Sequence, residues 1–175
     1  MDDFVLLSQL KKPFMTCLFI IFLLIPSGTV FSASPVVEMV STSDSPAVGD
    51  TFAIALFITK ADSFANWAQF LRFDKRKLKF VSQFAGTFKS FIPDSRDTEE
   101  INRTGEIRAG GFGLSDNSGG AGTLGIFKFV KLTMDSTVIR TEPKSKRNPF
   151  GLVIRSREGK YAVPEAGKPL IIGTR

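Results

Sequence analysis

Residues 46–80 decide the fold, and they read PAVGDTFAIALFITKADSFANWAQFLRFDKRKLKF. After the turn-forming residues Val48-Gly49-Asp50, the run Thr51–Thr59 places apolar side chains at every second position. A period of two is typical of a β-strand with one face against a core. A second run, Asn66–Asp74, is rich in aromatic and apolar residues. The stretch therefore predicts two strands, an acidic corner and the start of a third strand.

The remainder of the chain predicts more short strands. Gly, Asp, Asn, Ser and Pro cluster between the apolar runs, and no segment shows a long helical period. Strands at such short spacing indicate an all-β fold, built as an antiparallel β-sandwich. The additional strands are expected at Val36–Ser41, Leu78–Phe84, Glu106–Phe112, Thr123–Leu132, Gly151–Arg157 and Leu170–Ile172.

One predicted strand, Thr123–Leu132, does not keep its apolar residues on one parity. Leu124 and Ile126 lie at even positions, whereas Phe127 and Phe129 lie at odd positions. Either a β-bulge or a strand buried on both faces would explain this pattern.

The order of the short motifs resembles that of the cohesin domains of bacterial cellulosomes. The resemblance rests on Val48-Gly49-Asp50, on Phe73-Asp74, and on Leu78 and Phe80 at fixed distances after that pair. A later echo is Gly105-Glu106-Ile107, followed by Gly122-Thr123-Leu124. The similarity covers roughly residues 36–173. It implies a jelly-roll sandwich of about nine strands that recognises a dockerin-type protein partner.

The chain departs from the cohesin pattern at three positions. Lys75 stands where the family has proline after the Asp, and Gln69 replaces an inward aromatic residue. Ala68 corresponds most nearly to an acidic or amide residue that cohesins often present to dockerin.

The N-terminal residues 1–33 have the three regions of a signal peptide. Lys11 and Lys12 precede the apolar run Phe14–Ile25, and small residues follow around Ser32–Ser34. The run is short for a membrane span, which takes roughly 20 residues. We expect export to the periplasm, the cell surface or the medium, with an uncleaved membrane anchor as the alternative. Residues 34–175 are then a single domain.

Composition argues against an enzyme. The chain has no histidine, and its one cysteine, Cys17, lies in the apolar leader. Ser-His-Asp and Cys-His mechanisms are therefore excluded, as is a histidine-bound zinc site. We expect no catalytic residues, no cofactor and no bound metal.

Two polar loops are candidates for a calcium site or an acid and base pair. Ala85–Thr104 contains Asp94, Asp97, Glu99 and Glu100, and the second loop is the Gly-rich stretch Ser115–Gly122. Neither has the regular spacing of a calcium loop, and the second lacks the ending of a phosphate-binding loop. We interpret both as solvated connections. Asn102-Arg103-Thr104 matches a glycosylation sequon.

The net charge of +6 is concentrated in two clusters, at residues 75–79 and 144–147. Such clusters favour anionic partners, although solvated turns between strands would also contain them. Nucleic acid is not expected as a partner of an exported protein.

Strand parity predicts a partner-binding surface on the second strand. If Leu71 and Phe73 point inward, Trp67 and Gln69 do so too, and Ala68, Phe70 and Arg72 point outward. An exposed aromatic residue beside an arginine is typical of a protein recognition face. The alternative is that Phe70 lies under a loop, since parity alone does not decide its exposure.

These observations predict a secreted binding module that recognises another protein, either dockerin-like or a different envelope protein. Two alternatives stay open. One is a carbohydrate-binding module for polysaccharide attachment or breakdown. The other is an accessory component of an envelope or pilus assembly, and contact with a membrane is expected only if the leader is uncleaved.

Overall fold

The computed structural model describes residues 35–61, 64–87, 90–112, 120–143, 153–156, 161–162 and 165–173. Eight strands of four residues or more lie in these ranges: β1 (Val36–Ser41), β2 (Thr51–Ala61), β3 (Phe64–Arg72), β4 (Leu78–Ala85), β5 (Glu106–Phe112), β6 (Gly120–Lys131), β7 (Thr137–Thr141) and β8 (Val153–Ser156). Three shorter strands and one helix complete them: β9 (Tyr161–Ala162), β10 (Glu165–Ala166), β11 (Leu170–Ile172) and α3 (Thr98–Thr104).

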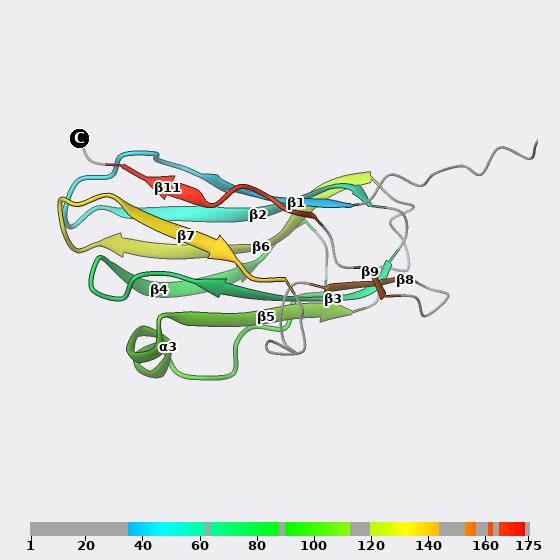
Figure 1. Ribbon diagram of the computed structural model, residues 1–175. Coiled ribbons are helices and arrows are strands. Elements are labelled where there is room, and N and C mark those ends of the chain that lie inside the picture. Colours follow the sequence, from blue (N-terminus) through cyan, green and yellow to red (C-terminus); the bar gives the residue numbers. More distant parts are fainter. Residues whose placement is uncertain are drawn as a thin grey trace, which may run out of the picture. The chain divides into compact units, whose positions relative to one another are not determined.

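The strands form two sheets, which lie face to face as a β-sandwich (Figure 1). The five-stranded sheet has the order β10-β1-β2-β6-β4. The six-stranded sheet has the order β11-β7-β3-β8-β9, with β5 paired to β3. All pairs are antiparallel except β1 with β10. The predicted all-β antiparallel sandwich is confirmed.

The core fills the space between the sheets with the inward side chains of both. Residues of β2 at even positions are buried, and their neighbours at odd positions are half-buried or exposed, as the period of two predicts. Phenylalanine rings interlock at the centre, where Phe129 contacts Phe52, Phe73 and Phe80 at centroid distances of 6.0, 5.2 and 5.9 Å. These rings supply much of the apolar surface that the core buries.

The irregular parity of β6 arises from a bulge. Against β2, the register moves from Leu56↔Gly125 to Phe57↔Thr123, so that Leu124 has no direct partner. Because of this extra residue, Leu124 and Phe127 both point into the core. The first of the two explanations offered by the sequence is therefore confirmed.

The motif residues Gly49, Asp50 and Asp74 hold turns between strands. Gly49 has φ 90°, a left-handed conformation that favours glycine, and the Asp50 carboxylate accepts a hydrogen bond from the Ala47 N–H (2.9 Å). Asp74 holds the corner after β3, because its carbonyl accepts from the N–H groups of Lys77 and Leu78. These contacts set the entry into β2 and the passage from β3 to β4.

The helix α3 was not predicted, and it interrupts the expected loop Ala85–Thr104. Asp97 is its N-cap, with a carboxylate that accepts from the Glu100 N–H (2.7 Å). Gly105 ends the helix at φ 73°, and its carbonyl accepts from the Phe73 N–H (3.0 Å). The helix thereby places the start of β5 beside the end of β3.

Two side-chain carboxamides attach the α3 segment to the outer edge of β4. The Asn102 amide accepts from the Phe80 N–H (2.7 Å) and donates to the Phe80 carbonyl (2.9 Å). The Gln83 amide makes the same pair of bonds to the backbone of Asp94, at 3.2 and 3.1 Å. The Asn102 amide thus satisfies the backbone groups of Phe80 on β4, and the Gln83 amide of β4 satisfies those of Asp94 in the neighbouring loop.

The predicted signal peptide, residues 1–33, lies outside the described residues and stays a prediction. Most of the Gly-rich loop Ser115–Gly122 and the basic cluster 144–147 also fall outside them. In the part of the chain that the structure describes, no helix is long and apolar enough to cross a membrane.

Candidate protein-binding face

The predicted contact residues lie on the outer face of the six-stranded sheet. The strand β3 lies inside this sheet, with β5 along one edge and both β7 and β8 along the other. Trp67, Gln69 and Leu71 are buried between the sheets, as the parity predicted. Ala68 and Arg72 lie on the opposite, outward side. The same parity places Phe70 there as well.

Phe70 is not an exposed aromatic residue, because only 4% of its surface is accessible. Its ring lies outside the central core cluster. The guanidinium groups of Arg72 and Arg108 lie over it, at 5.4 and 5.6 Å from the ring centroid. The expected exposure of Phe70 is therefore wrong, and the groups that lie over its ring are two arginine side chains. Phe70 therefore serves as an apolar support for the two arginines.

Five charged side chains on β3, β5 and β7 form a charged band across this face: Arg72, Glu106, Arg108, Arg140 and Glu142. Arg72 is at its centre, because it pairs with Glu106 (3.3 Å) and with Glu142 (2.9 Å). Arg108 reaches Glu106 at 3.5 Å, and Arg140 reaches Glu142 at 3.6 Å. Each arginine of the band thus has a carboxylate within 3.6 Å, although Arg72 and Arg140 lie directly opposite each other in the β3–β7 register.

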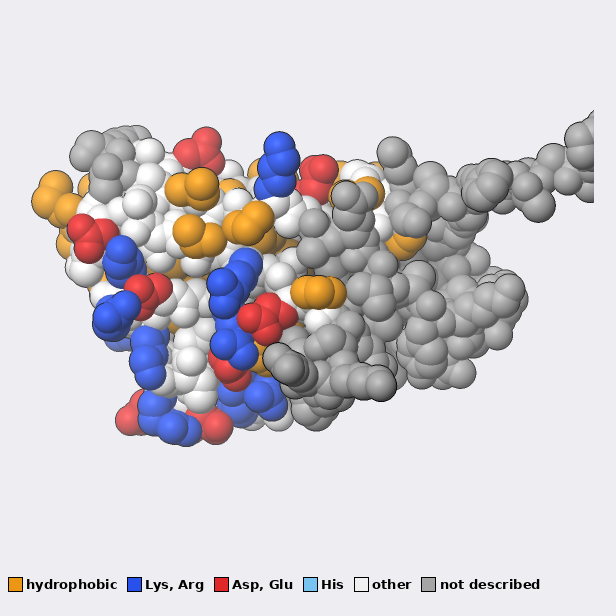
Figure 2. Space-filling view, in the orientation of Figure 1, with side chains coloured by type: hydrophobic (Ala, Val, Ile, Leu, Met, Phe, Trp, Pro, Cys, Tyr) orange, Lys and Arg blue, Asp and Glu red, His pale blue; other side chains and the backbone are white. Residues whose placement is uncertain are grey.

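The arginines of the charged band are more exposed than its carboxylates. The Arg side chains are 45–58% exposed, whereas those of Glu106 and Glu142 are 21–24% exposed. The surface that a partner would meet is therefore positive, although the ion pairs below it hold the arginines in place. Figure 2 shows basic and acidic side chains interspersed on this side of the molecule, beside a group of hydrophobic ones.

Ala68 lies at one end of the charged band, in a mostly apolar hollow. It pairs directly with Gly110, so that two small residues form the floor. Ile92 and Pro93 line one side of this hollow, and Arg108 lines another. The hollow has the size to admit a side chain from another protein.

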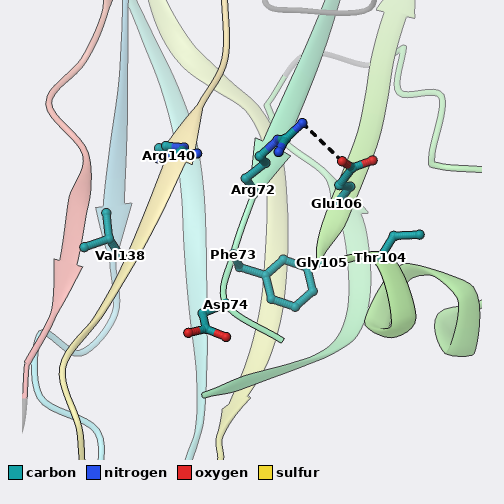
Figure 3. Close-up of a pocket in the computed structure, with 8 residues that line it drawn as sticks. All are labelled: Arg72, Phe73, Asp74, Thr104, Gly105, Glu106, Val138 and Arg140. Carbon is teal, nitrogen blue, oxygen red and sulfur yellow. Dashed lines mark ion pairs between the residues drawn. The ribbon is translucent and has the colours of Figure 1, made fainter. Parts of the chain in front are cut away.

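A second depression, of about 310 Å³, lies where β3 ends (Figure 3). Arg72, Glu106 and Arg140 line it from the charged band, and Asp74 lines it from the corner. The Asp74 carboxylate accepts hydrogen bonds from the Arg76 backbone (3.0 Å) and side chain (3.2 Å). These bonds lower the pKa of Asp74. The depression thus combines exposed arginines with a carboxylate that is already engaged.

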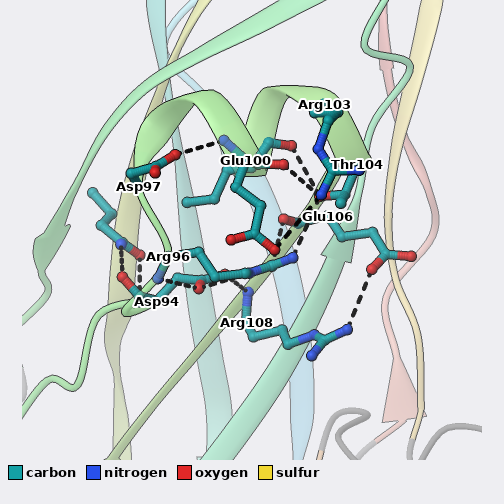
Figure 4. A network of polar contacts seen from close by, with 10 residues as sticks. Asp94, Arg96, Asp97, Glu100, Arg103, Thr104, Glu106 and Arg108 are labelled. Atoms are coloured by element: carbon teal, nitrogen blue, oxygen red, sulfur yellow. Dashed lines mark hydrogen bonds and ion pairs between the residues drawn. The ribbon is translucent and has the colours of Figure 1, made fainter.

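The carboxylate most deeply placed in the loop Ala85–Thr104 is Asp94, and it has a structural role (Figure 4). It accepts from the Arg96 side chain at 2.6 and 3.0 Å and from the Arg108 N–H at 2.7 Å. Arg96 also donates to the Glu106 carbonyl (2.9 Å). This network therefore holds the backbone of β5 at Glu106 and Arg108, the two residues of β5 that belong to the charged band.

Hydrogen bonding fixes the protonation of Asp94. Burial alone would raise the pKa of this carboxyl. The hydrogen bonds from Arg96 and Arg108, together with the Arg96 charge, outweigh that effect and hold the pKa below its usual value.

The other carboxylates of the loop do not assemble into an ion site. Asp97 caps α3, and Glu100 lies 3.9 Å from Arg103. Among the described residues, no group of three or more acidic, histidine or cysteine side chains could hold a metal ion. Asn102 of the sequon uses its amide nitrogen to bind the carbonyls of Phe80 and Thr98.

Sequence reasoning missed most of the charged band. Glu106 and Arg108 lie two positions apart on β5, and Arg140 and Glu142 lie two apart on β7 or just beyond it. That spacing is the signal that could have found them, since it puts each pair on one face of a strand. Their convergence on Arg72 depends on which strands pair, which the spacing alone does not give.

The fold is that of cohesin modules. A type II cohesin domain from the cellulosome of Acetivibrio cellulolyticus superposes with a TM-score of 0.63 at 18% identity, covering 79% of this chain and 95% of that one. A type II cohesin from Bacteroides cellulosolvens gives 0.59 at 13% identity, with 75% and 97% covered. A type I cohesin in complex with dockerin, from Clostridium thermocellum, gives 0.62 at 9% identity, with 80% and 99% covered. No protein-family model and no curated protein matches the sequence.

Proposed function

We propose that this chain is an exported, non-catalytic module that binds another protein through the outer face of its six-stranded sheet. The observation that carries the proposal is the charged band, in which ion pairs hold three arginines in fixed positions with their guanidinium groups accessible. Arginines ordered in this way complement carboxylates on a partner with little loss of side-chain entropy on binding.

The fold supports a protein partner of the dockerin type. Two of the similar structures, from Acetivibrio cellulolyticus and Clostridium thermocellum, are cohesins in complex with dockerin. The leader expected at residues 1–33 would deliver the module to the compartment where such partners act.

The three residues named from the sequence receive separate roles in this proposal. Arg72 contacts the partner, and Ala68 leaves room for an apolar side chain of the partner in the hollow beside Gly110. Phe70 acts indirectly, because it supports the guanidinium groups of Arg72 and Arg108.

Affinity capture from the producing organism tests the proposal. The bait is residues 34–175, compared with the double variant Arg72→Ala/Arg140→Ala and with Lys79→Ala, a control on the other sheet. The two dockerins of the compared complexes are titrated in parallel. We expect the double variant to lose at least tenfold in affinity, about 1.4 kcal/mol or more, and the control to bind as the wild type does.

Two results would contradict the proposal. A protein retained equally by all three baits would show that the charged band is not the binding surface. Retention on insoluble polysaccharide, competed by soluble oligosaccharide and without a protein prey, would move the assignment to carbohydrate binding.

A further inference from the structure

The outer face of the five-stranded sheet carries an apolar row that crosses four strands. Register aligns Val40 of β1 with Ala55 of β2, Ala55 with Ile126 of β6, and Ile126 with Phe84 of β4. Since neighbours in register lie on the same side of a sheet, the four side chains form one continuous line. This line runs along the face that points away from the core.

The ends of this row are open to solvent. Val40 is 54% exposed and Phe84 is 45% exposed, and Val81, which bulges out of the β4–β6 pairing, is 41% exposed. In the row on one side, Ala53 and Ser82 are small and Lys128 lies between them, and the row on the other side contains Glu38 and Phe57. The face therefore has an apolar centre with charged residues beside it, and exposed apolar patches often mark a contact with another surface.

At Phe80 the edge of β4 is already occupied. The Asn102 amide bonds both backbone groups of this residue, so an added strand could not pair there without displacing it. This local obstacle favours contact through the face of the sheet.

The face is just large enough for a weak specific contact. Four strands spaced about 4.8 Å apart, each with about four outward residues about 6.8 Å apart, give a whole outer face of about 500 Å². Two such faces together bury about 1,000 Å², the lower limit for a specific protein contact.

Among the described residues, this face carries an unpaired acidic and an unpaired basic side chain, so two copies of it can offer opposite charges to each other. Glu38 of β1 and Lys128 of β6 are exposed, and no ion pair joins either of them to the described residues. In the register, Glu38 of β1 lies opposite Phe57 of β2, and Lys128 of β6 lies opposite Ala53 of β2. The two charges are therefore on opposite sides of Ala55. A two-fold axis can lie above Ala55, parallel to the sheet and perpendicular to the line from Glu38 to Lys128. Such an axis places each Glu38 against Lys128 of the other copy. The Lys128 ammonium is held on this face, 4.9 Å from the Phe84 ring centroid.

From these observations we infer that the outer face of the five-stranded sheet joins two copies of this chain in a symmetric dimer. The apolar row forms the centre of the contact, and two Glu38–Lys128 pairs fix its orientation. The six-stranded sheets point outward in such a dimer, so each copy keeps its charged band accessible.

Sedimentation velocity of residues 34–175 over a range of protein concentrations tests the inference. We expect a reversible dimer with a dissociation constant roughly in the micromolar range, given the small area. Val40→Ser/Phe84→Ser should weaken it at least tenfold. The matched control is Val138→Ser/Ile171→Ser, an exposed apolar pair on the six-stranded sheet, which should leave it unchanged.

Charge exchange tests the geometry independently. Glu38→Lys and Lys128→Glu should each weaken the dimer, because like charges then face each other, and the double variant should restore it. A chain that stays monomeric to about 500 µM would overturn the inference, because that concentration lies far above a micromolar dissociation constant. A dimer that survives Val40→Ser/Phe84→Ser, or a double exchange that restores nothing, would overturn it as well.

Discussion

The two outer faces of this sandwich differ in what lies at their centres, although the same core supports both. At the centre of the six-stranded sheet, paired arginines and glutamates lie over a buried phenylalanine. At the centre of the five-stranded sheet, an apolar row with exposed ends lies between charged residues such as Glu38 and Lys128. A contact through the first should weaken with salt, and a contact through the second should respond little. The core thus fixes the sheets but leaves each outer face free to acquire its own chemistry.

The largest expected effect comes from removing the support of the charged face. Asp94→Asn removes the carboxylate paired with the largely buried Arg96 and leaves only the weaker influence of Glu100 and Glu106, and breaking a buried ion pair costs about 3 kcal/mol or more. We expect the urea midpoint of unfolding to fall correspondingly. Asp97→Asn, a change of the same type at the exposed helix cap, is the control, because asparagine also caps helices well. Equal midpoints for the two variants would show that the Asp94 network does not stabilise the sheet.

The ionisation of Asp94 should make the free energy of unfolding depend on pH in the acid range. Because the pKa of Asp94 is lower in the folded chain than in the unfolded chain, its contribution is complete above the unfolded value of about 3.9. The contribution is lost as the pH falls through the lower folded pKa. Unfolding measured between pH 7 and pH 2 should show a loss of stability in the acid range that is smaller in Asp94→Asn. Parallel profiles for the two proteins would exclude Asp94 as the source.

An intermediate effect is expected at the edge of the apolar-faced sheet. Asn102→Ala removes the bonds to both backbone groups of Phe80 and to the Thr98 carbonyl. At about 1 kcal/mol for each net hydrogen bond, we expect a loss of about 2 kcal/mol, given partial rescue by water. Thermal unfolding measures this loss, with Asn102→Gln as a variant that keeps the amide but misplaces it. A change below about 0.5 kcal/mol would mean that water replaces the amide fully.

The smallest effect sharpens the contrast between binding and stability. Arg140→Ala removes an ion pair in which the arginine side chain is more than half exposed, and such pairs contribute less than about 1 kcal/mol. We expect unfolding to change by less than about 0.5 kcal/mol, the usual range for surface substitutions. A large loss of stability would show that the charged band holds the sheet together rather than awaiting a partner.

The strands with a clear apolar alternation could be predicted from the sequence, and the others could not. The bounds of β1, β5 and β11 agree with the expected ones. Strand β7 was missed because its inward residues are Thr137, Ile139 and Thr141, so the apolar signal of its inner face is weak. The helix α3 was missed because it is one short segment with a single buried residue, Ile101, which gives no helical period.

The candidate site was predictable only in part. Parity correctly assigned the inward positions of Trp67 and Gln69, since it depends on one strand alone. The burial of Phe70 depends on Arg108, which reaches it from another strand through the β3–β5 register. Contacts of that kind require knowledge of strand pairing, which local periodicity does not contain.

The carboxamide of Asn102 has a consequence for how the protein behaves at high concentration. An outermost strand with open backbone groups is a template on which further chains can add, and repeated addition leads to fibrils. Here a side chain occupies the groups of Phe80 that such growth would need. A face-to-face pair has only one place for a second copy, so its association stops at two. The Asn102 amide therefore opposes open-ended strand addition at this point of the edge, while leaving the face free for a closed pair.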